Sequence, residues 1–205
     1  MPSCPTTRRA KGRFALTLCS ALLLMTACGA EATLLDSDEL PDVEKTINDA
    51  KAAPGGGWCD ELAYLETSMF DNAADGKHGE QYQLKNGDLV GAAVFGPGGR
   101  FADAASMLAG IEAAVTECTA DAAKGDYGEA TSEPLTGLPD GAVGFTFTSS
   151  SSNPRETGKT AYAETTDGNL LSVGVTHYGE GEPSVDVNEL LSTALKQVAE
   201  IDGEG

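Results

Sequence analysis

Basic residues are scarce in this 205-residue chain, which has 13 Lys and Arg against 32 Asp and Glu and a formal net charge of −19. Four of the basic residues precede residue 14, so the chain after residue 27 keeps nine basic and 32 acidic residues, a net charge of −23. A surface of that charge repels phosphate groups. The composition therefore argues against nucleic acid as a partner and against direct adhesion to anionic lipid headgroups.

The chain also lacks a hydrophobic run long enough to cross a bilayer, which takes about 20 residues. An apolar stretch from Phe14 to Ala27 follows a basic stretch and ends in small residues just before Cys28. This order of basic, apolar and small residues is typical of a secretory signal peptide. The sequence therefore predicts export, with residues 1–27 as the signal.

The quartet Met25-Thr26-Ala27-Cys28 resembles the lipobox of bacterial lipoproteins, in which the cysteine is diacylated and the signal is cleaved in front of it. The resemblance implies a lipid on Cys28 and a protein anchored by it to the outer face of the cytoplasmic membrane. An ordinary signal peptide with an incidental cysteine is the alternative. Residues 28–33 would then form a short tether, and residues 34–205 suit a single extracellular domain.

Few cysteines are left for a disulfide framework. Of the five, Cys4 and Cys19 belong to the predicted signal and Cys28 to the predicted anchor, so that Cys59 and Cys118 remain. In a chain that works outside the reducing cytosol, a single bridge between these two is the expected outcome. A redox-active pair is the alternative, but such pairs normally show a C-x-x-C spacing.

No catalytic or metal-binding motif is complete. The G-x-S-x-G signature of many hydrolases does not occur. The calcium-like run 71–76 has Ala73 at a ligand position, and Tyr82 occupies the position of the final carboxylate. His78 and His177 share no H-x-x-x-H spacing. The sequence therefore predicts no metal, no cofactor and no enzymatic activity.

Periodicity and turn signals predict helices that are separate from antiparallel hairpins. Asp186, with Glu189 three residues later, is the predicted N-cap of the last helix. Separate helices and hairpins indicate an α+β fold, an antiparallel sheet built from hairpins with helices packed on one face. The predicted helices span 42–53, 58–69, 101–118 and 187–201, and the hairpins span 80–95 and 158–179, with turns at Asn86-Gly87 and Asp167-Gly168.

The chain contains, in this order, Leu34-Leu35 with Leu40-Pro41, Val94-Phe95-Gly96-Pro97, the helix that leads to Cys118, and LTGLPDGAVGF at 135–145. This order of parts resembles the extracellular sensor domain of the mycobacterial kinase PknH, which many actinobacterial lipoproteins share. The resemblance implies an α+β sensor domain over roughly residues 34–201 and a Cys59–Cys118 bridge. The chain departs from the family in one respect, because the family's second bridge lies between late strands and residues 158–179 contain no cysteine.

Two functions of different classes follow as hypotheses. The first is a lipid-anchored binding or sensory module that recognises a small molecule, a glycan or an envelope protein. The alternative is a cell-envelope hydrolase with carboxylate catalysis, which requires two facing carboxylates in a cleft, one of them buried beside apolar side chains. A cleft lined by aromatic and aliphatic side chains would favour binding. Four aromatic residues in predicted strands are candidates for core or cleft, namely Phe145, Phe147, Tyr162 and Tyr178.

Overall fold

The computed structural model describes residues 33–50, 59–70, 79–124, 130–150 and 154–203. All of the described elements belong to one compact unit, Ala32–Gly205. The predicted signal peptide, Cys28, the tether up to residue 32, the calcium-like run and His78 lie outside the described residues. No helix in the described ranges is long and apolar enough to span a bilayer.

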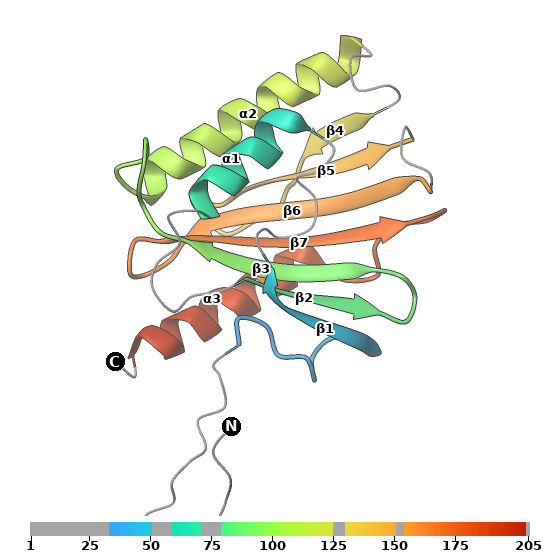
Figure 1. The fold of residues 1–205 in the computed structure, drawn as a ribbon, viewed down its shortest axis with the longest axis horizontal. Coiled ribbons are helices and arrows are strands. Elements are labelled where there is room, and N and C mark those ends of the chain that lie inside the picture. Colours follow the sequence, from blue (N-terminus) through green and yellow to red (C-terminus); the bar gives the residue numbers. More distant parts are fainter. Residues whose placement is uncertain (1–32, 51–58, 71–78, 125–129, 151–153, 204–205) are drawn as a thin grey trace, which may run out of the picture. The chain divides into compact units, whose positions relative to one another are not determined.

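Seven strands form one sheet in which every neighbouring pair is antiparallel (Figure 1). Their order across the sheet is β1-β2-β3-β7-β6-β5-β4, so the two long hairpins meet where β3 pairs with β7. The strands are β1 (Val43–Ala50), β2 (Gly79–Leu84), β3 (Leu89–Phe95), β4 (Thr131–Pro134), β5 (Val143–Ser149), β6 (Glu156–Glu164) and β7 (Leu170–Tyr178).

The two predicted hairpins are confirmed, as are their turns. Gly87, between β2 and β3, has a φ of 93°, and Gly168, between β6 and β7, has a φ of 80°. Positive φ angles are readily adopted by glycine, which has no Cβ, so glycine suits a tight turn between two strands. In the second turn, the backbone N–H of Thr165 donates to the carbonyl of Asn169 at 2.8 Å.

Three helices accompany the sheet: α1 (Asp60–Phe70), α2 (Ala104–Lys124) and α3 (Val187–Gly203). Each confirms a predicted helix, although α2 continues for six residues beyond Cys118. The predicted N-cap of α3 is also confirmed, because the carboxylate of Asp186 accepts a hydrogen bond from the backbone N–H of Asn188 at 2.8 Å.

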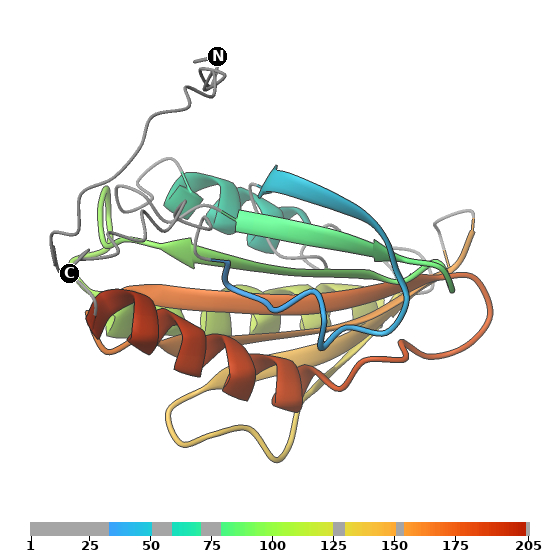
Figure 2. The same cartoon turned by 90° about the horizontal axis from the view of Figure 1, so that it is seen from below.

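The helices lie on both faces of the sheet, α1 and α2 on one and α3 on the other (Figure 2). The α+β class with an antiparallel sheet is confirmed, but the expectation that the helices share one face holds only for α1 and α2. Along β3, Ala92 and Val94 belong to the core under α3, whereas Ala93 and Phe95 belong to the core under α1 and α2. A central strand with apolar residues at successive positions has two apolar faces, and both need cover.

The helix predicted at 42–53 is wrong, because residues 43–50 form strand β1 at the edge of the sheet. β1 pairs with β2, with Thr46 opposite Tyr82 and Ile47 opposite Gln81. The helical pattern of the segment was weak, and its β-branched residues fit a pleated strand better. Pairing with β2 therefore decided the conformation.

Candidate functional site

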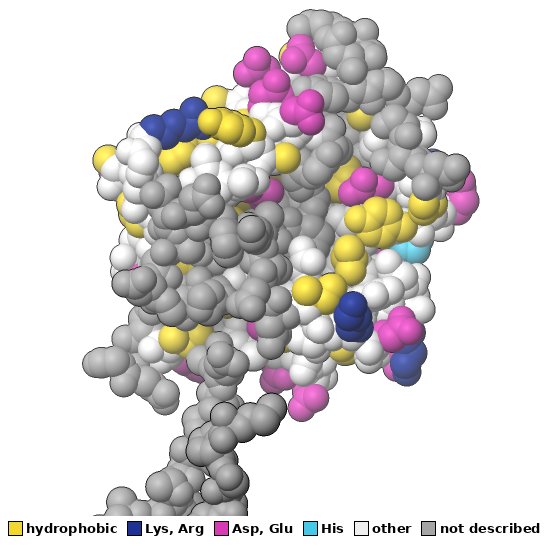
Figure 3. Space-filling view, viewed as in Figure 1, with side chains coloured by type: hydrophobic (Ala, Val, Ile, Leu, Met, Phe, Trp, Pro, Cys, Tyr) yellow, Lys and Arg dark blue, Asp and Glu magenta, His cyan; other side chains and the backbone are white. Residues whose placement is uncertain are grey.

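Two open grooves lie on the α1–α2 face of the sheet, one on each side of α2. The α1–α2 groove has a volume of about 470 Å³, and the β4–β5 groove, between α2 and the segment that joins β4 to β5, about 430 Å³. Over α1 and α2, a basic side chain, hydrophobic side chains and acidic side chains follow one another across the surface (Figure 3). The α1–α2 groove is lined by Glu61, Tyr64, Leu65, Arg100, Phe101, Gly110, Ala113, Ala114 and Glu117.

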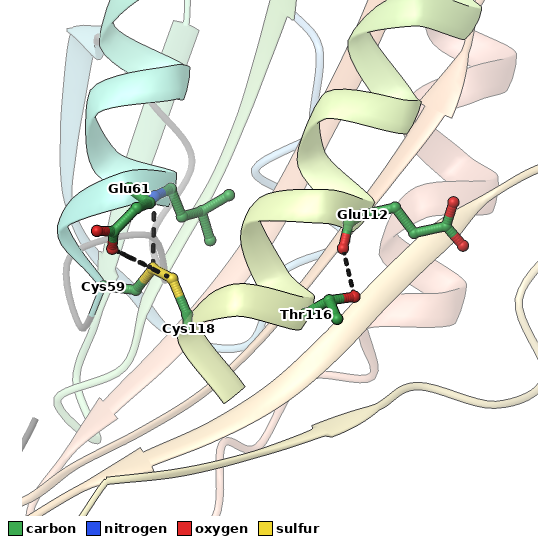
Figure 4. The surroundings of a disulfide bond; sticks show 6 residues. Cys59, Glu61, Glu112, Thr116 and Cys118 are labelled. Carbon is green, nitrogen blue, oxygen red and sulfur yellow. Dashed lines mark hydrogen bonds between the residues drawn. A yellow bond between two sulfur atoms is a disulfide. The ribbon is translucent and has the colours of Figure 1, made fainter. Parts of the chain in front are cut away.

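A disulfide between Cys59 and Cys118 joins the two helices at one end of this groove (Figure 4). Their Cα atoms are 5.9 Å apart, within the range of about 4.4–6.8 Å that disulfide geometry permits, and both side chains are fully buried. Cys59 lies just before α1, where its Sγ accepts a hydrogen bond from the backbone N–H of Leu62 at 3.4 Å. The bridge therefore fixes the start of α1 against α2.

The carboxylate of Glu61 lies against this bridge, with Oε2 3.8 Å from Cys59 Sγ and 3.7 Å from Cys118 Sγ. One oxygen and two sulfurs within 4.8 Å of one another could in principle bind a metal ion. Metal binding by cysteine requires the thiolate, however, and both sulfurs are engaged in the bridge. In the oxidised protein, Glu61 therefore places a negative charge beside a covalent crosslink.

The other end of the α1–α2 groove is formed by the turn before α2. The backbone N–H of Phe101 donates to the carbonyl of Gly98 at 3.0 Å, and the Phe101 ring lies directly on α2 at Gly110. A Cβ at Gly110 would come within 2.9 Å of that ring, so a larger residue there would require the ring to shift, which explains a glycine despite its low helix propensity. The guanidinium of Arg100 stacks on the outer side of Phe101, 4.9 Å from the ring centroid.

Tyr64 lies on the α1 wall and is 71% exposed, an unusual position for a large aromatic side chain. One side of α1 is an apolar stripe, since Leu62, Leu65 and Met69 are buried. Tyr64 lies off that stripe and therefore faces outward. The groove thus combines an exposed aromatic side chain, a stacked arginine and two exposed carboxylates, those of Glu61 and Glu117.

The β4–β5 groove has a different chemistry, because Glu112 is its one charged lining residue. Its walls are mainly aliphatic, and the buried ring of Phe145 reaches it from β5. Apolar grooves of this size can accept a hydrophobic group. The remaining lining residues are Ile111, Val115, Thr116, Pro134, Leu135, Gly137, Leu138, Ala142, Val143 and Gly144.

A buried carboxyl group, that of Glu66, lies between α1 and the sheet. It is 2% exposed and accepts a hydrogen bond from the Tyr162 hydroxyl at 2.7 Å. Burial raises the pKa of Glu66 to about 7, against the smaller lowering effect of that hydrogen bond, and burial likewise raises the pKa of Tyr162. Glu66 lines neither groove, so its perturbed pKa belongs to the core rather than to a solvent-accessible cleft.

A second polar network surrounds Asp88 at the first hairpin turn. His177 Nδ1 lies 2.6 Å from Asp88 Oδ1, while the hydroxyl and backbone N–H of Ser184 donate to Asp88 Oδ2 at 2.6 and 2.8 Å. Burial raises the pKa of Asp88, but these hydrogen bonds, together with one from Asn86, outweigh it and hold the pKa below its usual value. The serine contacts the aspartate rather than the histidine, so the histidine is not placed to deprotonate it as a catalytic triad requires.

The aromatic candidates divide between core and surface. Phe145, Phe147 and Tyr162 are buried, whereas Tyr178 is 43% exposed and lines neither groove. Sequence reasoning did not identify Tyr64 or Arg100. Two signals could have found them, a large aromatic residue on the polar side of a helix and an arginine in a glycine-rich turn just before the longest helix.

Comparison of the chain with protein-family models, with curated proteins and with solved structures finds no match in any of the three. The resemblance to the PknH-type sensor domain therefore stays a prediction.

Proposed function

We propose that the chain is an exported, lipid-anchored module of the cell envelope that binds a ligand in the α1–α2 groove. The order of residues before Cys28 supports export and lipidation, and the lipid would hold the domain at the outer face of the cytoplasmic membrane. The short tether at residues 29–33 would keep the domain close to that surface.

The observation that supports binding most strongly is the construction of the α1–α2 groove. Its walls include two helices joined by a disulfide. The exposed Tyr64 comes from α1, and the stacked Arg100 comes from the turn before α2. Exposed aromatic side chains beside a few oriented polar groups are characteristic of recognition surfaces. A groove whose walls are covalently joined also loses little conformational entropy when a ligand binds.

The same geometry favours binding over carboxylate hydrolysis. Catalysis of that kind needs a raised carboxyl pKa within reach of a substrate. The described carboxyl group with the pKa of about 7 is Glu66, which faces Tyr162 in the core. The carboxylates that line the α1–α2 groove, Glu61 and Glu117, are both exposed.

A ligand search on the mature protein tests the proposal. A ligand that binds only the folded state raises the melting temperature, so envelope fractions are screened by thermal shift. The stabilising fraction should lose its effect on Tyr64→Ala but keep it on Tyr178→Ala, a matched control that removes an exposed tyrosine outside the groove. Equal responses of the two variants would move the binding site away from this groove.

The anchor is tested separately with Cys28→Ser. If Cys28 is diacylated, this change should release the protein to the medium or leave the signal uncut, because the acyl chains supply the membrane affinity at about 0.8 kcal/mol per buried CH₂. Mass spectrometry of the mature wild-type protein is the direct measurement. An unmodified Cys28 would refute lipidation without affecting the groove.

A further inference from the structure

The α1–α2 groove is polarised along its length. At the end near the start of α2, Arg100 is stacked on Phe101, and among the described residues no carboxylate pairs with it. The stacking orients the guanidinium while leaving its N–H donors available. A guanidinium held in this way is suited to bidentate recognition of a carboxylate.

The opposite end of the groove is acidic. Glu61 contacts the disulfide and Glu117 directly precedes Cys118, so both carboxylates lie at the bridged end. Glu117 lies seven positions after Gly110, on which Phe101 rests, and this corresponds to a rise of about 10 Å along the helix. Positive and negative groups therefore occupy opposite ends of one groove.

Apolar surface lies between the two charged ends. Tyr64 borders the groove from α1, and Ala113 and Ala114 form its floor on α2. The sequence of basic, hydrophobic and acidic side chains over α1 and α2 in Figure 3 follows the same order. A matching ligand therefore carries a negative group at one end, a positive group at the other and an apolar part between them.

We propose that the α1–α2 groove binds a short peptide of about three residues with free termini. Its carboxylate would pair with Arg100 and its amino group with Glu61 and Glu117. An extended chain of three residues spans about 10 Å, comparable to the rise along α2 from Gly110 to Glu117. Such a peptide carries no net charge, so the field of a mature chain with a net charge of −23 does not repel it, as it would a simple anion. A simple cation would leave Arg100 without a partner.

This inference rests on the proposed function and is tested by isothermal titration of the mature full-length protein with the tripeptide Ala-Phe-Ala. N-acetylation or C-amidation of the peptide should each weaken binding by about tenfold. Arg100→Gln should weaken the free tripeptide to a similar degree and cause no further loss with the amidated form. The double variant Glu61→Gln with Glu117→Gln should show the same insensitivity to acetylation, and Tyr178→Ala should bind as the wild type does.

Three results would overturn the inference. Equal binding of the free and the doubly blocked peptide would refute recognition of the termini, and no binding of any peptide would refute the ligand class. Light scattering that shows a dimer dissociated by Arg100→Gln would assign the groove to a second copy of the chain. If peptides fail while an envelope fraction still stabilises the wild type but not Tyr64→Ala, the proposed function stands without this ligand. If neither binds, both proposals fail.

Discussion

The two faces of the sheet are closed by different means. Under α3, the core is aliphatic apart from Tyr82, and the helix covers it together with the segment that contains Leu34 and Leu35. The backbone N–H of Leu35 donates to the buried carboxyl group of Glu80 on this face. Under α1 and α2, the core contains large aromatic rings, a buried carboxyl group and a disulfide. The groove beside α3 measures about 130 Å³, against about 430 and 470 Å³ for the two grooves beside α2.

This difference indicates which face is built for stability and which for recognition. α1 has 11 residues, and isolated helices shorter than about 12–15 residues are marginal in water. Apolar contacts hold part of it, but Glu61 and Tyr64 face the groove rather than the core. The disulfide therefore helps to fix α1 against α2, as a wider apolar stripe on α1 would otherwise do. The α1–α2 face can therefore present polar and aromatic groups to solvent and still keep a defined shape.

Removing the disulfide should have the largest effect on stability, and the effect should be concentrated on the α1–α2 face. Cys59 and Cys118 are 59 residues apart, and on the loop-entropy model the double change Cys59→Ala with Cys118→Ala should cost about 4 kcal/mol. Urea unfolding measures the total loss. Hydrogen exchange should show that the amides of α1 and α2 lose more protection than those of α3, because the disulfide joins α1 to α2 and does not involve α3. Unchanged stability would mean that α1 needs no crosslink.

The buried carboxyl group should give the α1–α2 face a pH dependence of its own. Glu66 has a pKa of about 7 in the folded protein against 4.5 for the ordinary side chain, so the folded state holds this proton more tightly. Its contribution to stability is therefore present below pH 4.5 and is lost as the pH rises to 7, a decrease of about 3 kcal/mol. Glu66→Gln keeps an acceptor for the Tyr162 hydroxyl and cannot titrate.

The difference in unfolding free energy between wild type and Glu66→Gln, measured from pH 4.5 to 8, isolates this group. The variant should be the more stable protein at pH 8, and the advantage should shrink toward pH 4.5. Glu80→Gln, on the α3 face, is the matched control. Burial raises the pKa of Glu80, but a backbone N–H from Leu35 partly stabilises its charged form, so this change should alter the pH dependence of stability less than Glu66→Gln does. If the unfolding free energies of wild type and Glu66→Gln changed in parallel with pH, the Glu66 carboxylate would be solvated in the folded protein and its pKa would not be raised.

Local signals in the sequence predicted most of this fold. Asn86-Gly87 and Asp167-Gly168 specify turns through backbone conformation alone, and Asp186 specifies a helix start through one hydrogen bond. The edge strand β1 was missed because its conformation depends on pairing with β2, which its own residues do not encode strongly. The position of α3 on the opposite face was likewise set by the sheet, through apolar residues on both sides of β3.

The candidate groove was less predictable than the elements that form it. Cys59 and Cys118 could be paired because few cysteines remained, and this pairing brings α1 beside α2. Tyr64 and Arg100 share no motif, and they line one groove because Phe101, next to Arg100, lies on Gly110 of α2. That contact lies at Gly110, in the middle of a helix. The sequence alone does not indicate that a ring packs on this glycine.

Removing the N-cap of α3, on the other face of the sheet, should have a smaller effect on stability. Asp186→Ala removes the side-chain oxygen that accepts the Asn188 N–H and should cost about 1 kcal/mol of unfolding free energy. Because the loss is confined to the first turn of α3, ligand-induced stabilisation at the α1–α2 groove should be unchanged. Thermal melts with and without the stabilising fraction measure both quantities. A lost ligand response in this variant would show that the two faces are coupled.

The smallest expected effect on stability is that of Glu61→Gln, and it concerns the chemistry of the bridge. A thiol reductant attacks a disulfide as its thiolate and releases a second thiolate, so a carboxylate 3.7–3.8 Å from both sulfurs opposes the charge that develops. Glu61→Gln should therefore be reduced several-fold faster by dithiothreitol, while an uncharged phosphine should reduce both proteins at similar rates. Glu117→Gln, in the same groove, is the matched control and should behave as the wild type does.

We expect reduction of the wild type to be slow, because both cysteines are fully buried, and the fold to be weaker afterward. Rapid reduction with little loss of structure would instead identify Cys59 and Cys118 as a redox-active pair, and the α1–α2 face would then owe its shape to packing alone.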